Sequence, residues 1–385
     1  MERHREMKNI PIILMGCGGV GRQLLQHIVH CRTLHANMGI HLRVVGVCDS
    51  KTVLVTSDVL STEFDDALLI NICKTKSDRL SLEKCFDSGK CEASSYSEFR
   101  RKLTDIAARL GFVLVDCSAS SETIEVITQT VKLGCCTVLA NKKPLTGPME
   151  EFDQLFLQPR RIRHESTVGA GLPVIASLNR IISSGDEVTS IVGSLSGTLG
   201  YVMSEVENGK PFSEVVKAAK DLGYTEPDPR DDLSGMDVAR KGLILARLLG
   251  QRIDMNTIKI ESLYPDKMGP GTMTLEDFLA NGLPLLDNDI KERVKKASSD
   301  GKVLRYVCIL RNSTCIIGIH EVLKDSALGR LKGSDNVVEI CSRCYEHPNP
   351  LVIQGAGAGN DTTAAGVLAD IIDLQDQFPF TNTGK

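Results

Sequence analysis

The sequence lacks any apolar run that approaches the length of a membrane span. It also lacks a strongly basic arm or stripe, because 45 lysines and arginines stand against 49 aspartates and glutamates, for a net charge of -4. These absences argue against a membrane protein and against a nucleic-acid-binding protein. Residues 1–9 are polar and lead directly into an apolar segment, so we expect no signal or transit peptide there.

Paired cysteines of the kind that build a disulfide framework or a zinc site are also lacking. The chain has 13 cysteines, an odd number, scattered along its length. Cys341 and Cys344 form a Cys-x-x-Cys, but no second pair follows to complete a zinc site. We therefore expect reduced thiols, mostly in the core, and a cytoplasmic location.

What the chain does have is length and ordinary globular composition. Its 385 residues suffice for two or three domains, and 42% hydrophobic with 24% charged residues is typical of a soluble protein. We find no internal repeat and no low-complexity segment.

A glycine-rich turn follows the first apolar segment. Residues 10–15 favour a buried parallel strand, the sequence Gly-Cys-Gly-Gly-Val-Gly occupies residues 16–21, and apolar residues at a helical period come next. Strand, glycine turn and helix in this order are typical of a dinucleotide-binding site, in which the helix N-terminus faces a pyrophosphate. The candidate cofactor residues here are Gly16, Gly18, Gly19, Val20 and Gly21.

The end of the second expected strand, residues 42–48, leaves the choice of cofactor open. Asp49 stands where an acidic residue usually binds the ribose hydroxyls of NAD. Lys51, two residues later, could instead contact the 2′-phosphate of NADP. We expect helices and loops over residues 50–100.

Two further strand ends carry polar residues. Residues 112–115 are followed by Asp116 and Ser118, and residues 137–140 are followed by Lys142. Ligands bind at the carboxyl ends of strands in such sheets. Ser118 could equally cap the next helix, and Lys142 could equally be an ordinary surface lysine.

A sixth strand, expected over residues 161–167, runs into a small-residue turn ending at Pro173. Exposed carbonyl oxygens in such a turn suit a hard cation if the carboxylate of Glu165 lies close. The turn also serves as the connection to the next domain.

The second half of the chain has a different pattern. Strand-like segments at residues 188–195, 305–310, 315–322, 337–341 and 351–353 predict an antiparallel or mixed sheet. An acidic stretch, residues 224–241, leads into an apolar helical pattern. A Gly/Ala run at residues 355–359 then opens a helix over residues 362–374.

These patterns predict an α/β protein with a Rossmann-type doubly wound parallel sheet and a second, α+β domain, to which the resemblance described below assigns catalysis and dimerisation. We place the dinucleotide-binding domain at residues 1–168, completed by residues 359–385. The substrate-binding domain is placed at residues 169–358.

Taken together, the motifs resemble the monofunctional type of homoserine dehydrogenase over nearly the whole chain. The matching segments include residues 16–21, 140–143, 165–173, 193–198, 223–233, 237–241 and 355–366. The acidic stretch with its Asp-x-x-x-Lys end is the most specific of them.

The resemblance implies reversible reduction of L-aspartate 4-semialdehyde to L-homoserine with NADP or NAD, in threonine, methionine and isoleucine biosynthesis. It implies a homodimer, and neither a C-terminal regulatory domain nor an aspartate kinase module. It assigns the glycine turn, Ser118, Lys142 and Gly359 to the cofactor. It assigns Glu165, Val168, Ala170 and Leu172 to a sodium or potassium ion, and Gly197, Thr198, Tyr224, Glu226, Asp237 and Lys241 to the substrate.

Residue chemistry agrees with this assignment. A carboxylate such as Glu226 suits the ammonium group of the substrate, and Lys241 can give a proton to the oxygen as hydride arrives from the nicotinamide. Asp237 either positions Lys241 or binds the amine itself. Asp231 and Asp232 stay unassigned between pocket and scaffold.

Two other functions compete with this interpretation. One is a catalytically silent NAD(P)-binding paralogue that senses a metabolite, and intact Glu226, Asp237, Lys241 and Lys142 argue against it. The other is a different semialdehyde reductase on the same scaffold.

Overall fold

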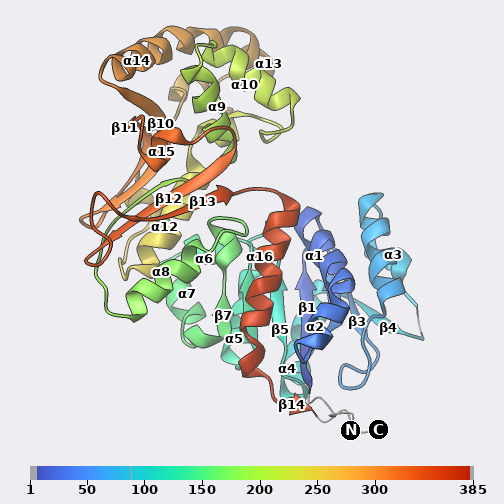
Figure 1. Ribbon diagram of the computed structural model, residues 1–385. Coiled ribbons are helices and arrows are strands. Elements are labelled where there is room, and N and C mark those ends of the chain that lie inside the picture. Colours follow the sequence, from blue (N-terminus) through green and yellow to red (C-terminus); the bar gives the residue numbers. More distant parts are fainter. Residues whose placement is uncertain (1–6, 88, 382–385) are drawn as a thin grey trace. The chain divides into compact units, whose positions relative to one another are not determined.

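The computed structural model describes residues 7–87 and 89–381 (Figure 1). The chain divides into two compact units, one formed by Met1–Gly171 with Gly359–Lys385 and the other by Leu172–Ala358. Residues 1–6 of the polar N-terminal segment lie outside the described part. Among the helices of the described residues, none combines the length and the apolar character needed to cross a membrane.

The first unit is built on one eight-stranded sheet of order β4-β3-β2-β1-β5-β6-β7, with β14 paired to β1. The five neighbouring strands β2, β1, β5, β6 and β7 run parallel to one another. Strands β3 and β4 continue the sheet beyond β2 in antiparallel pairs, and β14 pairs antiparallel with β1. The α/β class is confirmed, but the sheet is mixed instead of wholly parallel. Its strands are β1 (Met7–Met15), β2 (Ile40–Cys48), β3 (Thr52–Thr56), β4 (Cys91–Ser95), β5 (Val113–Asp116), β6 (Cys136–Leu139), β7 (Ile162–Arg163) and β14 (Phe380–Thr381).

Helices cover this sheet because its central strands are apolar on both faces. Ile10 and Ile12 through Met15 of β1 are at most 1% exposed, as expected for a strand buried between helical layers. Helix α16 packs beside α1 in the same core (Figure 1). The helices of this unit are α1 (Gly19–His30), α2 (Arg32–Asn37), α3 (Asp66–Ser77), α4 (Tyr96–Arg109), α5 (Ile124–Lys132), α6 (Lys143–Thr146), α7 (Met149–Leu155) and α16 (Asn360–Asp373), with single 3₁₀ turns at η1 (Leu82–Cys85), η2 (Pro159–Arg161), η3 (Glu165–Thr167) and η8 (Gln375–Gln377).

Two expectations for this unit were wrong. Residues 50–100 contain β3 and β4 as well as helices, because the sheet is extended by an antiparallel pair beyond β2. The strand expected at residues 161–167 is only the two residues of β7. Its chain then turns into η3, where the backbone N–H of Thr167 bonds to the carbonyl of His164 and that of Glu165 to Asp370.

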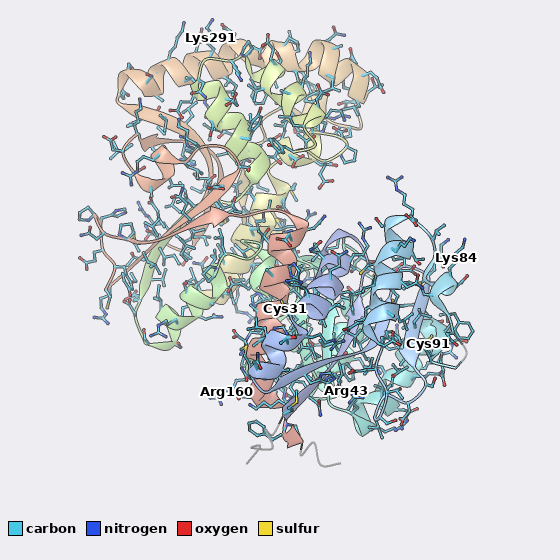
Figure 2. All side chains as sticks on the ribbon, turned by 45° about the vertical axis from the view of Figure 1, so that its right-hand side comes forward. Cys31, Arg43, Lys84, Cys91, Arg160 and Lys291 are labelled. Carbon is cyan, nitrogen blue, oxygen red and sulfur yellow. The ribbon has the colours of Figure 1, made fainter. Side chains whose placement is uncertain are left out.

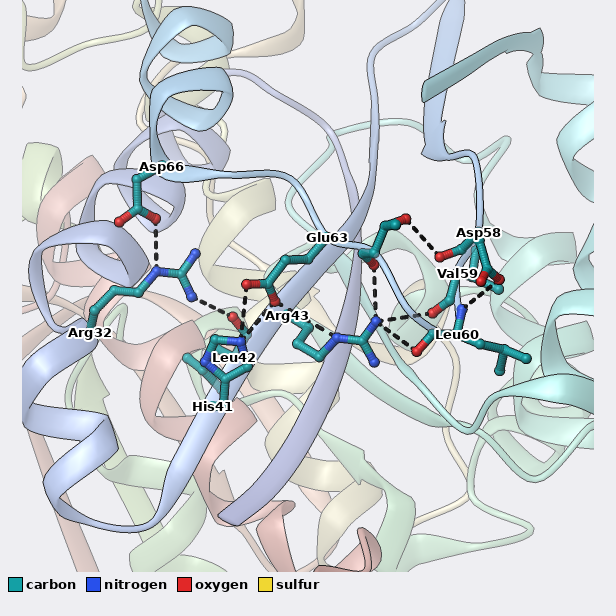
Figure 3. Close-up of polar contacts among 10 residues, drawn as sticks. Arg32, His41, Leu42, Arg43, Asp58, Val59, Leu60, Glu63 and Asp66 are labelled. Carbon is teal, nitrogen blue, oxygen red and sulfur yellow. Dashed lines mark hydrogen bonds and ion pairs between the residues drawn. The ribbon is translucent and has the colours of Figure 1, made fainter. Parts of the chain in front are cut away.

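The connection between β3 and α3 is held against β2 by two basic side chains (Figure 3). Arg43 donates to the carbonyl oxygens of Val59, Leu60 and Thr62, and His41 lies 2.8 Å from Glu63. Arg32 pairs with Asp66 at the start of α3. These contacts tie the β3–α3 connection and the start of α3 to β2 and α2, so that α3 is held as part of the same unit.

All 13 cysteines are free thiols, as the odd number led us to expect. Cys91, for example, is 2% exposed and packs in the core of the first unit. Charged side chains such as Lys84, Arg160 and Lys291 are exposed at the surface (Figure 2).

The second unit contains a six-stranded sheet of order β13-β12-β8-β10-β11-β9. Its neighbours are antiparallel except β9 and β11, which are parallel. The strands are β8 (Val188–Ser194), β9 (Lys259–Ile260), β10 (Lys302–Arg311), β11 (Thr314–Leu323), β12 (Asp335–Ser342) and β13 (Leu351–Ala356). A mixed sheet was expected here, although β10 and β11 are longer than the apolar pattern indicated.

Helices of the second unit include several that the apolar pattern did not reveal, above all α14. They are α8 (Val174–Ser183), α9 (Gly197–Glu207), α10 (Phe212–Asp221), α11 (Arg230–Leu233), α12 (Met236–Leu248), α13 (Leu275–Asp277), α14 (Asp287–Ser299) and α15 (Ala327–Arg330), with short turns at η4 (Met255–Thr257), η5 (Asp266–Met268), η6 (Phe278–Gly282) and η7 (Leu283–Leu286). Helix α12 packs on β10 and β11. This contact places the end of the acidic stretch over the sheet.

Candidate active site

The glycine turn between β1 and α1 has the close backbone packing that its sequence predicts. Gly16 has φ +90°, and a Cβ there would lie 2.6 Å from the backbone nitrogen of Ser118. A Cβ on Gly21 would lie 2.0 Å from the carbonyl oxygen of Gly16. Gly18 has open space around it and caps α1 without a side-chain hydrogen bond. The first turn of α1 therefore offers backbone N–H groups and a positive helix end to an anion.

A cavity of about 620 Å³ opens over this turn. Its lining combines the glycine turn with the ends of β2, β5 and β6: Met15, Gly16, Cys17, Gly18, Cys48, Asp49, Ser50, Lys76, Tyr96, Ser118, Ala119, Ser120, Glu122, Thr123 and Lys143. Gly16, Gly18, Asp49 and Ser118 from the expected cofactor set meet here. Gly19, Val20 and Gly21 form the adjoining first turn of α1.

The edge of the cavity near β5 is held by a buried carboxylate. Asp116 accepts hydrogen bonds from the backbone N–H of Ser118 at 2.8 Å, the hydroxyl of Thr123 at 2.7 Å and the amide of Asn141 at 3.0 Å. This network joins the ends of β5 and β6. It gives Ser118 a fixed position beside the glycine turn.

Asp49 lines the cavity, but its carboxylate is already engaged. One oxygen accepts from the backbone N–H groups of Lys51 and Thr52, both at 2.9 Å. The other accepts from Lys76 Nζ at 2.7 Å and from the backbone N–H of Leu82 at 3.3 Å. Burial alone would raise the pKa of Asp49, but these four donors outweigh it and lower that pKa.

The remaining expected cofactor residues lie at two helix starts. Lys142 is the N-cap of α6 and is half-buried, and the next residue, Lys143, lines the cavity. Gly359 caps α16 with φ +116°. A Cβ on Gly19 would lie 2.6 Å from the side chain of Asn360, the first residue of α16, so this helix begins directly against the turn of α1.

The segment expected to hold a cation is buried. The backbone N–H of Glu165 donates to Asp370 Oδ2 at 2.9 Å, and both side chains are less than 10% exposed. Ala170 adopts a left-handed conformation with φ +56°, which is unusual for a residue with a side chain. Leu172 begins the second unit, and its carbonyl accepts from the N–H of Val174 at 2.8 Å. Within residues 7–87 and 89–381, no three His, Cys, Asp or Glu side chains are arranged to hold a metal ion.

In the second unit, a buried arginine fixes the first half of the acidic stretch. Arg230 is 3% exposed and forms a two-pronged ion pair with Asp228, with its shortest distance 2.6 Å. It also donates to the carbonyl oxygens of Met268 and Met273. Asp228 is thus a scaffold residue, and the Arg230 guanidinium beside it holds the pKa of its carboxyl below the ordinary value.

The second half of the stretch forms α12, which carries Asp237 and Lys241 one turn apart. Lys241 Nζ lies 2.9 Å from Asp237 Oδ2 and donates to the carbonyl oxygen of Leu195 at 2.7 Å. The Lys241 side chain is 10% exposed and that of Asp237 is 47% exposed. Two of the three ammonium protons are therefore directed by the protein, and the buried lysine is no surface ion pair.

The other expected substrate residues surround this pair from two loops. Thr198, in the first turn of α9, donates to the carbonyl of Tyr224 at 2.5 Å, and Gly197 begins that helix. Asp232 accepts from the backbone N–H of Glu226 at 2.8 Å. Burial, with the nearby charges of Glu226 and Asp237, raises the pKa of Asp232. These contacts group the β8–α9 turn and the acidic stretch around one cluster of carboxylates.

Several functional candidates were missed by the sequence interpretation. Asp232 was left unassigned, yet it is the carboxylate of the stretch with the raised pKa. Leu195 contributes only its backbone, which no side-chain pattern can reveal. Lys76 and Tyr96 come from the segment expected to be irregular, where no motif marked them.

Comparison with known proteins places this geometry in a family. The family model for homoserine dehydrogenase matches residues 173–372. Homoserine dehydrogenase of Saccharomyces cerevisiae is 41% identical over 276 residues, which cover 69% of this chain and 76% of the yeast protein. A bifunctional aspartokinase/homoserine dehydrogenase of Haemophilus influenzae is 34% identical over 371 residues, or 95% of this chain and 43% of that protein. The chain thus spans about two fifths of the length of such bifunctional relatives.

Solved structures agree on the fold. A protein of unknown function from Candida auris is 34% identical, with a TM-score of 0.82 over 96% of this chain and 99% of that one. A putative homoserine dehydrogenase from Archaeoglobus fulgidus, 22% identical, has a TM-score of 0.73 over 96% of this chain and 99% of its own, which supports the fold alone. By family model and by sequence identity, the chain belongs to the homoserine dehydrogenase family.

Proposed function

We propose that this protein catalyses the NAD(P)-dependent, reversible oxidation of L-homoserine to L-aspartate 4-semialdehyde, in the biosynthesis of threonine, methionine and isoleucine. The observation that carries the proposal is the buried Lys241, directed by Asp237 and by the carbonyl of Leu195 within a ring of carboxylates. Family membership supplies the reaction, and these residues supply a site with the matching chemistry.

The substrate carries an ammonium group, and the site is acidic where an ammonium has to bind. Burial raises the pKa of Asp232, and the negative charges of Glu226 and Asp237 raise it further. A bound cation relieves the repulsion among these charges. We assign the amine to this cluster, with Tyr224, Gly197 and Thr198 bounding the pocket. This proposal gives Asp232 a role in the pocket, while Asp228 belongs to the scaffold and the exposed Asp231 has no assigned role.

Lys241 moves the proton. In the oxidation, its amine takes the hydroxyl proton of homoserine, and in the reduction its ammonium returns that proton to the oxygen. Hydride chemistry is supplied by the nicotinamide when the cofactor is bound. Asp237 and the Leu195 carbonyl hold the Lys241 nitrogen in place through the cycle, so we assign Asp237 to positioning as well as to the acidic cluster.

The glycine turn fits a dinucleotide. The uncapped start of α1, the open space at Gly18 and the cavity of about 620 Å³ together suit a pyrophosphate with its attached nucleosides. We assign the ends of β2 and β5 to the cofactor as well, with Ser118 lining the cavity, and Lys142 and Gly359 at its margins. A hyperthermophilic archaeal homoserine dehydrogenase of the same fold was solved in complex with NADPH, at 20% identity and a TM-score of 0.70 over 97% of this chain.

The occupied carboxylate of Asp49 bears on the choice between NADP and NAD. Selectivity for NAD rests on an acidic residue that is available to the ribose hydroxyls. Here both oxygens of Asp49 accept from the loop and from Lys76, so we propose that Asp49 is structural and that NADP is accepted.

We also propose a bound sodium or potassium ion at Glu165 and the carbonyl groups of Val168, Ala170 and Leu172. Support comes from two adjacent buried carboxyls: burial raises the pKa of Asp370 to about 8, and the charge of Glu165 adds to this. An oxygen-lined turn next to a buried carboxylate is what a hard monovalent cation requires.

Assembly and compartment complete the proposal. We propose a homodimer, because β13 pairs only with β12 within the described sheet and leaves an edge that a partner can cover. We propose a cytoplasmic location, with which the free thiols agree.

The decisive experiment follows homoserine oxidation with NADP and with NAD for the wild type and for Lys241→Ala. We expect activity in the wild type and a loss of about 100-fold or more in kcat for the variant. A wild type without homoserine activity would refute the function, and an undiminished variant would refute the role of Lys241. Dependence on added sodium or potassium, measured in the same assay, tests the cation.

A further inference from the structure

Helix α12 presents a face of small residues to the sheet below it. Gly235, Ala239, Gly242 and Ala246 recur at intervals of three or four and so lie on one side of the helix. Ala239 and Ala246 are fully buried. Lys241, the residue to which the proposed function gives the proton transfer, directly precedes Gly242 and points about 100° away from this face. The contact between the small-residue face of α12 and the sheet, called the seat of the helix below, therefore sets the position of Lys241.

Gly242 rests directly on two thiols. A Cβ at this position would lie 2.8 Å from Cys308 Sγ on β10 and 2.9 Å from Cys315 Sγ on β11. These distances are well inside a normal van der Waals contact, so any side chain lifts the helix or displaces the sulfurs. The cysteines are 0% and 4% exposed and have little room to move.

A second contact anchors the start of the helix. Gly235 has φ +73°, and a Cβ there would lie 1.9 Å from the hydroxyl oxygen of Tyr306. That hydroxyl is itself fixed, because it donates to the carbonyl of Glu261 at 2.7 Å. Because its start at Gly235 and its middle at Gly242 both contact β10, the helix has a defined height over the sheet.

The sheet that supports Gly242 also carries the acceptor of the Lys241 hydrogen bond. Cys308 pairs in register with Gly193 of β8, and two residues later the carbonyl of Leu195 accepts from Lys241 Nζ at 2.7 Å. The thiols under Gly242 and the Leu195 carbonyl that accepts from Lys241 are thus fixed relative to each other by strand pairing. Raising the helix over Cys308 stretches the bond between Lys241 and Leu195.

We propose that Gly242 is a positioning residue for the reaction: its missing side chain seats α12 on the thiols of Cys308 and Cys315 and thereby holds the Lys241 ammonium against the Leu195 carbonyl. The two thiols fix the distance between α12 and strands β10 and β11. Hydrogen bonding to Cys315 and burial raise the pKa of Cys308 well above its ordinary value, so it stays a neutral thiol and is a poor nucleophile.

The test compares Gly242→Ala with a variant that restores the space. We expect Gly242→Ala to lower kcat for homoserine oxidation by roughly 10- to 100-fold, because a displacement of about 1 Å at a catalytic group has that effect. The KM for homoserine should change much less, since Glu226 and Asp232 of the acidic cluster lie outside α12 and are left in place. The triple variant Gly242→Ala/Cys308→Ala/Cys315→Ala removes both sulfurs and should recover most of kcat.

Two controls separate positioning from loss of stability. Leu243→Ala removes a fully buried side chain of the same helix without adding bulk under it, and should lower the melting temperature but not the kcat of folded enzyme. Cys308→Ala/Cys315→Ala with Gly242 intact measures the effect of the cavity alone. If Gly242→Ala does not fold, Gly242→Ala/Cys308→Ala retains the clash with Cys315 and should have a lower kcat than the triple variant, and an equal kcat would contradict the proposal.

The proposal is overturned by an unchanged kcat in folded Gly242→Ala, or by a triple variant that folds stably and stays as slow as Gly242→Ala. It is equally overturned if Leu243→Ala loses as much kcat as Gly242→Ala. A wild type that does not oxidise homoserine counts against the proposed function instead, so the two failures are distinguishable.

Discussion

Asp237 Oδ2 and Lys241 Nζ are 2.9 Å apart on neighbouring turns of α12, and the carboxylate is the more exposed partner. An exposed i, i+4 pair contributes little to stability. Here, however, the lysine is buried and also bonded to a backbone carbonyl. The carboxylate therefore acts mainly on the orientation and charge of Lys241.

Replacing Asp237 by asparagine tests this relationship. Asparagine can still accept a hydrogen bond from Lys241 but carries no charge, so we expect kcat to fall by about 10-fold or more, together with a rise in the KM for homoserine because the acidic cluster loses one charge. Steady-state kinetics of homoserine oxidation separate the two constants. Asp231→Asn, an exposed carboxylate of the same stretch, is the matched control and should behave as wild type. A raised KM with kcat preserved would leave Asp237 with amine binding alone and would contradict its role in positioning Lys241.

Much of the fold was predictable, because its signals are local. The apolar run of β1, the glycines at 16–21 and the helical period of α1 occur in one continuous segment, and each constrains its neighbour. The same holds for residues 224–241, where the acidic residues and the Asp-x-x-x-Lys spacing indicate a candidate site before any tertiary contact is known.

Other elements carry no such signal. Strand β4 reads Cys-Glu-Ala-Ser-Ser, which has little β-propensity and forms because β3 supplies a partner. Helix α14 buries only Ile290 and Ala297, so its apolar stripe is narrow within a mostly charged sequence and was passed over. The Thr-Val-Leu-Val-Thr of β3 was a recognisable strand signal that the interpretation passed over.

The site divides in the same way. Lys241, Asp237 and Glu226 are candidates that their side chains and spacing alone suggest. The Leu195 carbonyl, the thiol floor under Gly242 and the occupied state of Asp49 depend on contacts between segments far apart in the chain. Residue spacing in the sequence cannot predict these contacts, because each one depends on how helices and strands pack in the folded chain.

The charge of Asp232 is expected to lower the stability of the fold at pH 7 and to favour binding of the substrate amine. Because burial and its acidic neighbours raise its folded pKa, the native state binds more protons than the unfolded state between the two pKa values. Stability is therefore lost as pH rises from the ordinary carboxyl value through the raised one. Asp232→Asn should be more stable than wild type at pH 7 and no more stable near pH 3.8, as measured by urea unfolding at both values.

The same substitution should raise the KM for homoserine, because a negative charge next to the substrate amine is removed. A variant that gains stability and keeps its KM would leave Asp232 without a role in binding. One that loses stability at pH 7 would contradict the sign of the pKa shift.

Arg305 is expected to be a main determinant of stability in the second unit. It is 0% exposed, pairs with Glu207 at 2.9 Å and donates to the carbonyls of Leu304, Leu328, Gly329 and Leu331. Arg305→Ala should cost about 3–5 kcal/mol, since it leaves several buried carbonyls without this donor and leaves the largely buried Glu207 with Lys332 as its remaining ion-pair partner. Arg293→Ala removes a half-exposed pair with Glu261 and should cost about 0–1 kcal/mol. Chemical denaturation of both variants gives the comparison, and equal losses would contradict it.

The hydrogen bonds that occupy both oxygens of Asp49 lead to a prediction about the choice between NADP and NAD. If its carboxylate only holds the loop at residues 49–52 and Lys76, then Asp49→Ala loosens one wall of the cofactor cavity for either dinucleotide. We expect the KM values for NADP and for NAD to rise by similar factors, together with a lower melting temperature, because hydrogen bonds to a charged group are worth about 1.5–3 kcal/mol each. Lys51→Ala, which changes an exposed side chain next to this loop, reports separately on a 2′-phosphate: if Lys51 binds that phosphate, only the KM for NADP rises. A rise for NAD alone in Asp49→Ala would mean that the carboxylate leaves the loop to bind the ribose hydroxyls, and the structural role would have to be abandoned.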